Sequence, residues 1–97
     1  MSTTPESKIK KRVIEILESE TGVYYFFPAA NGFGRTAIPD IICCVRGKFL
    51  AIECKAGSLS ATAIQQRELI RINSSGGTGI VINADSIDDL ARIIKQL

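Results

Sequence analysis

The stretch that decides the fold is IPDIICCVRGKFLAIECK, residues 38–55. It contains two apolar runs, 38–45 and 49–55, and Arg46-Gly47 lies between them. A two-residue connection with glycine is typical of a tight β-hairpin turn, so the runs are predicted to be antiparallel strands. Both runs are almost continuously apolar, which is typical of a sheet covered on both faces.

The short turn also predicts the register of this hairpin. Counting outward from Val45 and Lys48, Asp40 lies opposite Glu53, on the same face, with roughly 5 Å between their Cβ atoms. Lys55 follows Glu53 by two residues and therefore points to that face as well. The open end of the hairpin is predicted to bring two carboxylates and one ammonium group together.

This combination of charges favours a catalytic site. Two facing carboxylates repel each other, and one takes up a proton unless a cation lies between them. A hard divalent ion such as Mg²⁺ binds a few carboxylate oxygens, keeps several waters, and offsets charge on a phosphate. Lys55 can orient or deprotonate a water, or hold a phosphate oxygen. The alternative is a structural ion pair between Lys55 and either Asp40 or Glu53.

The flanking sequence predicts a small α/β domain. The expected elements are a helix at about 5–20, strands at 23–28, 38–45 and 49–55, a helix at 62–74, a strand at 78–83, and a helix capped by Asp85. In the 62–74 helix, Ile64, Leu69 and Ile72 are expected to face the core. The order α-β-β-β-α-β-α, with a helical crossover before the last strand, predicts a mixed four-stranded sheet flanked by helices.

Length and composition limit the possibilities further. The chain has 97 residues, which predicts a single domain spanning 1–97, and its 45% hydrophobic and 23% charged content is that of a globular protein. No apolar run reaches the roughly 20 residues that span a membrane, and no secretion signal is recognisable. We therefore expect a cytoplasmic protein without a membrane partner. The net charge of +2 is too small to predict a nucleic-acid partner alone.

The inventory of histidine and cysteine excludes several kinds of site. The sequence has no histidine, which excludes histidine-based triads and metal sites. Its three cysteines are an odd number without a C-x-x-C motif, which predicts neither a disulfide framework nor a zinc site. Cys43, Cys44 and Cys54 lie in apolar runs and are expected to behave as small hydrophobic residues.

Taken together, these motifs resemble those of the PD-(D/E)xK nuclease superfamily, and within it the VRR-NUC domain family. The resemblance rests on the order and spacing of several features along almost the whole chain: Glu6, the loop 31–35, Ile38-Pro39-Asp40-Ile41-Ile42, residues 47–55 ending in Glu53-Cys54-Lys55, Gln65 and Gly76-Gly77. A Val-Arg-Arg triplet is absent near the last strand, which contains Ile80-Val81-Ile82-Asn83. The resemblance implies a restriction-endonuclease-like core and a DNA endonuclease that depends on Mg²⁺ or Mn²⁺.

The resemblance also implies roles for individual residues of the catalytic centre. Asp40, Glu53 and the backbone carbonyl of Cys54 would bind the metal, and Lys55 would be the catalytic lysine. Gln65 is similar to the family's glutamine that supports the lysine or the water.

Two of the implied residues have competing interpretations. Gln66 is the rival of Gln65, and either can be a simple surface amide. Glu6 resembles the family's first-helix glutamate, which reaches the metal through water. An acid in the first helical turn also complements the helix dipole, so a purely structural role stays open for Glu6.

The expected substrate is DNA. Arg35, in the polar and glycine-rich segment 29–36 that is expected to be a mobile loop, is predicted to contact a phosphate beside the active site. Lys8, Lys11 and Arg67 are the further candidate DNA contacts. The alternative functions are a nuclease for flaps or single strands, and a catalytically silent DNA-binding module of the same fold.

The assembly and the preferred substrate follow from the resemblance. Stand-alone members of the family look like dimeric junction resolvases, which implies a homodimer acting on branched DNA such as four-way (Holliday) junctions. The sequence adds an aromatic cluster that either fills the core or forms the dimer interface: Tyr24, Tyr25, Phe26, Phe27 and Phe33.

Overall fold

The computed structural model describes residues 4–29 and 37–97. In chain order the elements are α1 (Pro5–Ser19), β1 (Val23–Phe26), β2 (Ile41–Val45), β3 (Lys48–Cys54), α2 (Ala63–Ser74), β4 (Thr78–Ile82), the 3₁₀-helix η1 (Ile87–Asp89) and α3 (Leu90–Gln96). The predicted element order is confirmed, with η1 as an additional turn before the last helix. No helix in the described ranges is long and apolar enough to cross a membrane.

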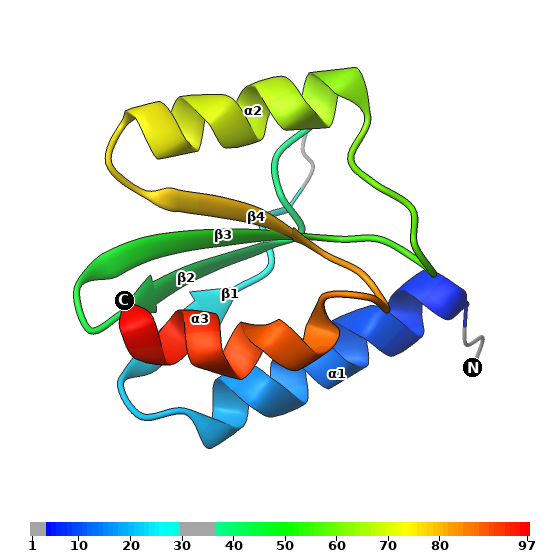
Figure 1. Ribbon diagram of the computed structural model, residues 1–97. Coiled ribbons are helices and arrows are strands. Elements are labelled where there is room, and N and C mark those ends of the chain that lie inside the picture. The colour runs from blue at the N-terminus through cyan, green and yellow to red at the C-terminus, as the bar shows by residue number, and fades with distance from the viewer. Residues whose placement is uncertain (1–3, 30–36) are drawn as a thin grey trace.

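These elements form three layers. The sheet lies in the middle, with α2 over one face and both α1 and α3 over the other, as Figure 1 shows. The strand order is β1-β2-β3-β4, and β4 is parallel to β3 whereas the other neighbours are antiparallel. The predicted mixed four-stranded sheet flanked by helices is thus confirmed.

The hairpin turn has the predicted length and sets the predicted register. Val45 pairs with Lys48, and the pairing continues outward as expected. Arg46 and Gly47 both have positive φ values, 47° and 87°, as a type I′ turn requires. The unusual backbone of Arg46 is held by its side chain, which donates hydrogen bonds of 2.7 Å to the carbonyl oxygens of Thr21 and Ile94.

Strand β2 begins at Ile41, later than the predicted residue 38. Pro39 has no N–H to donate to a sheet, and the backbone pairing ends with Ile41 opposite Ile52. Beyond that point the Asp40 carboxylate accepts a hydrogen bond of 2.9 Å from the backbone N–H of Cys54. The regular pairing therefore keeps the predicted register but stops one residue short of Asp40 and Glu53, and a side chain continues the hairpin instead.

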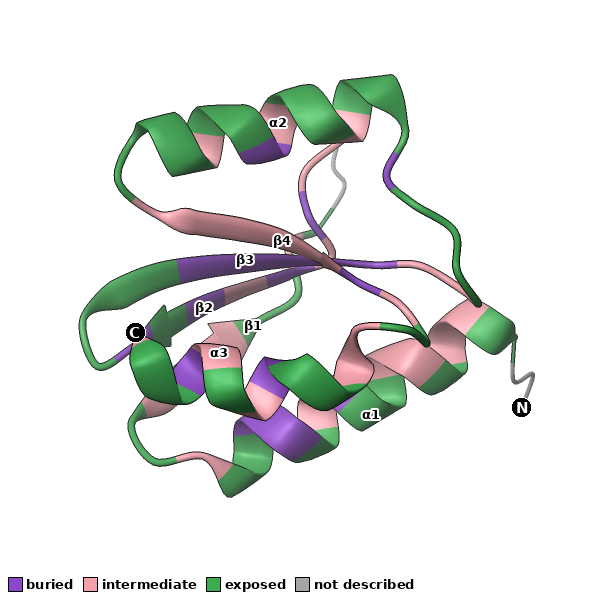
Figure 2. Ribbon diagram, in the orientation of Figure 1, coloured by how far each residue is buried: buried purple, intermediate pink, exposed green. Residues whose placement is uncertain are grey.

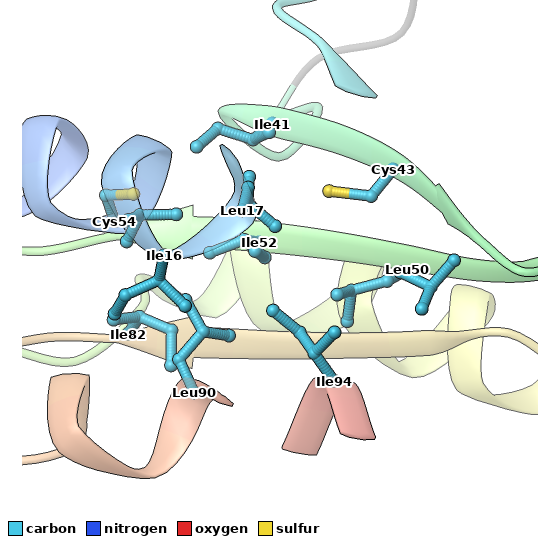
Figure 3. Packing of buried hydrophobic residues seen from close by; sticks show 12 residues of the cluster. Ile16, Leu17, Ile41, Cys43, Leu50, Ile52, Cys54, Ile82, Leu90 and Ile94 are labelled. Carbon is cyan, nitrogen blue, oxygen red and sulfur yellow. The ribbon is translucent and has the colours of Figure 1, made fainter. Parts of the chain in front are cut away.

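The core lies between the sheet and the α1–α3 layer, where Figure 3 shows its packing. Alternate strand residues point to this face, and helical stripes of α1 and α3 meet them. The buried hydrophobic residues of this cluster are Val13, Ile16, Leu17, Ile41, Cys43, Val45, Leu50, Ile52, Cys54, Ile82, Leu90 and Ile94. Burial raises the pKa of the Cys43 and Cys54 thiols to about 12, so both behave as hydrophobic side chains as predicted. Cys44 is exposed, because it points to the opposite face of β2.

The α2 face of the sheet is covered less completely, as the exposed colouring of this helix in Figure 2 shows. Leu69 is buried and Ile72 is half-buried, as predicted. Ile64 is 57% exposed, so its predicted place in the core is wrong. The residues that turn toward the sheet follow the helical spacing from Gln65 through Leu69 to Ile72, and Ile64 lies outside that stripe.

The start of the last helical segment also differs from the prediction. Asp85 does not cap it, because the residue before η1 is Ser86, which makes no side-chain cap hydrogen bond. The side chain of Asn83 instead accepts hydrogen bonds from the backbone N–H groups of Asp85 and Ser86, at 2.9 and 3.1 Å. An Asx-type turn at the end of β4 therefore binds backbone N–H groups ahead of the last helical segment, in place of the expected helix cap.

The close packing of α2 on β4 yields a first prediction. A Cβ atom at Gly79 would lie 3.1 Å from Cδ2 of Leu69 and 3.2 Å from its carbonyl oxygen. Gly79→Ala should push the helix from the sheet and lower the free energy of unfolding by roughly 1–3 kcal/mol, as overpacking commonly does. Chemical denaturation measures this change. Equal stability of the Gly79 variant and the wild type would contradict this packing.

Candidate active site

The candidate site lies at one end of the sheet, where β2 begins and β3 ends. The N-termini of α1 and α2 reach the same end of the molecule from opposite faces of the sheet, as Figure 1 shows. Glu6 comes from the first turn of α1, and Gln65 comes from the first turn of α2. Asp40 precedes β2, while Glu53 and Lys55 lie at the end of β3. The fold therefore brings together all five side chains that the sequence assigns to the catalytic centre.

The Asp40 carboxylate is fixed by two groups on the α1 side of the sheet. Its Oδ2 accepts the 2.9 Å hydrogen bond from the Cys54 N–H, and its Oδ1 lies 3.5 Å from Nζ of Lys10. The side chain is 23% exposed. One oxygen is thus held by the backbone of β3, while the other faces a cation.

Glu53 is the buried carboxylate of the site, with 4% of its surface exposed. Its Oε2 lies 3.7 Å from Nζ of Lys55 and accepts a 3.0 Å hydrogen bond from Nε2 of Gln65. The pKa of this carboxyl is raised to about 7, first by burial and next by the charge of Asp40, while the Lys55 ammonium opposes both. One lysine therefore does not offset burial and the neighbouring carboxylate together.

Gln65 is oriented at both ends of its side-chain amide. Its Oε1 accepts a 2.9 Å hydrogen bond from the N–H of Thr62, and its own N–H donates to the Thr62 hydroxyl, which completes a capping box. Its Nε2 is left to bind Glu53. Gln66 donates to the carbonyl of Ala61 instead, so Gln65 is the glutamine that reaches the site, and the residue it contacts is Glu53 rather than the lysine.

Lys10 is a site residue that the sequence reasoning missed. Its Nζ lies between Asp40 and Glu6, at 3.5 Å from Oδ1 of the former and 3.6 Å from Oε2 of the latter. Burial alone would lower the pKa of Lys10, but the two carboxylates outweigh it and raise the pKa above its ordinary value. The sequence did contain a sign of this position. Glu6 and Lys10 are four residues apart on the first helix, which is the spacing of an ion pair on one face, and the core residue Val13 follows on that face.

The candidate DNA contacts lie outside this cluster. Lys8 and Lys11 are exposed on α1, and Arg67 is exposed on α2. The two helices that carry them flank the site from opposite faces of the sheet. Arg35, together with the predicted loop 29–36 except its first residue, lies outside the described residues.

The donor set of the site suits a hard divalent cation. Among the described residues, no group of three or more His, Cys, Asp or Glu side chains could hold a metal ion. Mg²⁺ requires only one or two carboxylates besides its waters, and Asp40, Glu53 and the Cys54 carbonyl supply oxygen donors alone. Burial, and after it the neighbouring charge of Asp40, raises the pKa of Glu53, and a bound divalent cation would stabilise the charged form against both effects. The residues present therefore fit Mg²⁺ or Mn²⁺.

Comparison with known proteins relates this geometry to a fold. No family model matches the sequence. The chain is 28% identical over 91 residues to the protein named "Putative nuclease p44" of Acyrthosiphon pisum secondary endosymbiont phage 1. The alignment covers 93% of this chain and 95% of that protein.

Solved structures decide the fold. A VRR_NUC domain superposes with a TM-score of 0.78 at 24% identity, over 93% of this chain and 97% of its own. The chain has the VRR-NUC fold. A second VRR_NUC domain protein matches over 98% of this chain and 88% of its own, with a TM-score of 0.69 and 18% identity.

A lower similarity is found to the structure of Hjc of Archaeoglobus fulgidus, a Holliday junction resolvase. It matches with a TM-score of 0.54 and 22% identity, over 78% of this chain and 63% of its own. The predicted restriction-endonuclease-like core and the resemblance to VRR-NUC domains are thus confirmed at the level of the fold.

The buried Glu53 makes the stability of the metal-free protein depend on pH. An unfolded Glu titrates near 4.5 and the folded one near 7, so between these values the folded state holds a proton that the unfolded state has lost. The contribution of Glu53 to the free energy of unfolding is therefore largest below about pH 4.5. It falls by up to roughly 3 kcal/mol as the pH rises to 7.

Thermal unfolding in EDTA between pH 5 and 7.5 measures this effect. The sequence has no histidine, and Glu53 is the side chain in the described ranges whose shifted pKa falls in this window. The wild type should lose stability as the pH rises, and Glu53→Gln should flatten the slope. Parallel profiles for the two proteins would contradict the raised pKa.

Proposed function

We propose that residues 1–97 form a metal-dependent DNA endonuclease that hydrolyses phosphodiester bonds, in the cytoplasm. The observation that carries the proposal is the convergence of Asp40, the buried Glu53 and Lys55 at the end of one hairpin. The VRR-NUC fold and the similarity to a phage protein named as a nuclease support it. An ordinary structural ion pair would not bury a carboxylate whose charge is left uncompensated.

The residues would divide the work of hydrolysis among them. Asp40, Glu53 and the Cys54 carbonyl would hold Mg²⁺ or Mn²⁺, and Glu6 would contribute through a water. When bound, the ion neutralises negative charge that develops on the phosphate. Asp40 reaches this position already oriented, because the Cys54 N–H holds one of its oxygens.

Lys55 and Gln65 would act beside the metal ligands. The Lys55 ammonium lies 3.7 Å from Glu53, and it would orient the attacking water or hold a nonbridging phosphate oxygen. Gln65 is a positioning residue, because its hydrogen bond fixes the Glu53 carboxylate. Lys8, Lys11, Arg67 and Arg35 would bind the DNA backbone through its phosphates, without reading sequence.

Substitution of the central residues tests the proposed mechanism. Asp40→Asn, Glu53→Gln and Lys55→Met should each reduce cleavage of labelled DNA at least about 100-fold, and EDTA should abolish wild-type cleavage. Gln65→Ala should lower kcat, whereas Gln66→Ala, which removes an amide one position away, should not. Circular dichroism of each variant checks that it remains folded.

The outcome separates the nuclease from a catalytically silent module of the same fold. If the protein were a silent module, the wild type and the three variants would bind DNA equally well. None of the four proteins would nick or cut the DNA. Wild-type rates in any folded variant of Asp40, Glu53 or Lys55 would refute the assignment of that residue. Full activity in excess EDTA would refute the metal requirement.

We further propose that the active species is a homodimer that cuts branched DNA, with the four-way junction as its preferred substrate. The fold match to a Holliday junction resolvase supports this substrate. One chain carries one site, so paired incisions require two copies, and a twofold dimer would match the symmetry of a junction. The alternative is a nuclease for flaps or single strands.

An exposed aromatic surface supports the dimer. Tyr24 and Phe26 on β1 are 70% and 47% exposed, and Phe49 on β3 is 46% exposed. They lie on one face of the sheet, because Tyr24 is opposite Cys44, which is itself opposite Phe49. The rings of Tyr24 and Phe26 are 6.5 Å apart. Apolar side chains gathered on one surface are typical of an interface.

The other aromatic residues divide between core and surface. Tyr25 packs against the core, and its hydroxyl donates a 2.5 Å hydrogen bond to Glu18. Phe27 is 51% exposed. Phe33, which the sequence placed in the same cluster, lies outside the described residues.

The double substitution Tyr24→Lys/Phe26→Lys tests the proposed interface. It should convert a dimer into a monomer in light scattering at micromolar concentration, since buried ammonium groups would oppose association. It should also reduce cleavage of four-way junctions more than nicking of linear duplex. Ile70→Lys is the control, because Ile70 is a 60% exposed apolar residue on α2, outside this surface.

Two results would end this part of the proposal. A wild-type protein that is monomeric and cuts linear duplex as fast as junctions contradicts both the dimer and the substrate. Preferential cleavage of flaps or single strands supports the alternative substrate instead.

A further inference from the structure

The packing of α1 directs Lys10 toward the end of the sheet at which Asp40 lies. On α1, Glu6, Lys10, Val13 and Leu17 follow one another at helical spacing and lie on one face. Val13 and Leu17 are buried in the core. Packing of these two residues therefore directs the preceding turns of the same face, with Lys10 and Glu6, over the end of the sheet at which Asp40 lies.

The contact of Lys10 with Asp40 involves the carboxylate oxygen that the backbone leaves available. Oδ2 of Asp40 is occupied by the N–H of Cys54, and Oδ1 faces Nζ of Lys10. Oδ1 is therefore the oxygen that Asp40 would offer most readily to a divalent cation, and it is the one that Lys10 faces. If Glu6 acts through a water, the cation would also lie near Glu6. In the metal-free protein, the ammonium of Lys10 lies between these two acids.

The charges at the site suggest what this ammonium does. Glu6 and Asp40 come from separate segments of the chain, and Lys10 is the cation that both contact. Without it, the two carboxylates would oppose each other with no cation between them. With it, a metal ion meets the repulsion of a neighbouring positive charge.

We propose that Lys10 is an internal counter-ion that holds Asp40 and Glu6 in the metal-free protein and is displaced when a divalent cation binds. The proposal rests on the proposed metal site at Asp40 and Glu53. Lys10 would then lower the metal affinity of the nuclease while it preserves the arrangement of the ligands. The long, flexible side chain of lysine suits this exchange, because its head group can move to solvent while α1 remains in place.

Binding of Mn²⁺ alone, in the absence of DNA, tests the exchange by calorimetry. Lys10→Met should bind Mn²⁺ more tightly than the wild type by about tenfold, which corresponds to about 1.4 kcal/mol. Lys10→Arg keeps the charge and should stay near the wild-type affinity. Arg12→Met is the matched control, because it removes one positive charge from the same helix and breaks an exposed ion pair, with Glu15, away from the site.

Thermal unfolding of the same proteins supplies a second, independent measurement. In EDTA the Lys10→Met protein should unfold at a lower temperature than the wild type, because its Asp40 and Glu6 carboxylates have lost their shared cation. Saturating Mn²⁺ should raise its unfolding temperature by more than it raises that of the wild type. If Lys10→Met does not fold, Lys10→Gln carries the same expectations with a more polar side chain.

The outcomes separate this inference from the proposed function. Equal or weaker Mn²⁺ binding by Lys10→Met, with clear binding by the wild type, overturns the role of Lys10 and leaves the metal site intact. Binding of Mn²⁺ by neither protein overturns the metal site and the counter-ion together. Tighter binding by both Lys10→Met and Arg12→Met reflects the general charge of α1 and also overturns the inference.

Discussion

The two-residue turn at Arg46-Gly47 is the constraint on which the rest of the structure depends. It sets the register of β2 and β3, and that register decides which residues point to the α2 face. A shift of one residue would exchange the two faces, so that Glu53 would enter the hydrophobic core and Ile52 would face the site. The side chain of Arg46 secures the turn from two sides, because it binds carbonyl oxygens next to β1 and in α3.

Much of the fold could be read from local patterns, and the failures occurred where tertiary contacts decide. The hairpin, the mixed sheet and the convergence of Asp40, Glu53 and Lys55 follow from spacing and turn chemistry, whereas Gln65 was expected there only from the resemblance to a nuclease family. Periodicity could not show that Asp40 binds a backbone N–H instead of extending β2. Lys10 escaped notice because its partner Asp40 is distant in sequence, although Glu6 is near. Arg35 lies outside the described residues.

The site brings together negative charges whose mutual repulsion opposes the stability of the domain. Glu6, Asp40 and Glu53 converge on Lys10 and Lys55, and the most buried of the acids has the raised pKa. Local rules of stability are commonly broken where function requires it. The hydrophobic cluster between the sheet and the α1–α3 layer lies on the other side of β3, and its burial is the favourable contribution against which the cost of the buried acid stands.

The double engagement of Gln65 has a consequence for motion. One side-chain amide both completes the first turn of α2, through Thr62, and holds Glu53. Fraying of that helix end therefore also removes the hydrogen bond of Gln65 to Glu53, and among the described residues it leaves the carboxylate with Lys55 alone. Helix ends open more readily than the global structure unfolds, so the order of the candidate site depends on a local opening equilibrium at the start of α2. Hydrogen exchange at the backbone N–H groups of this turn would report the same opening.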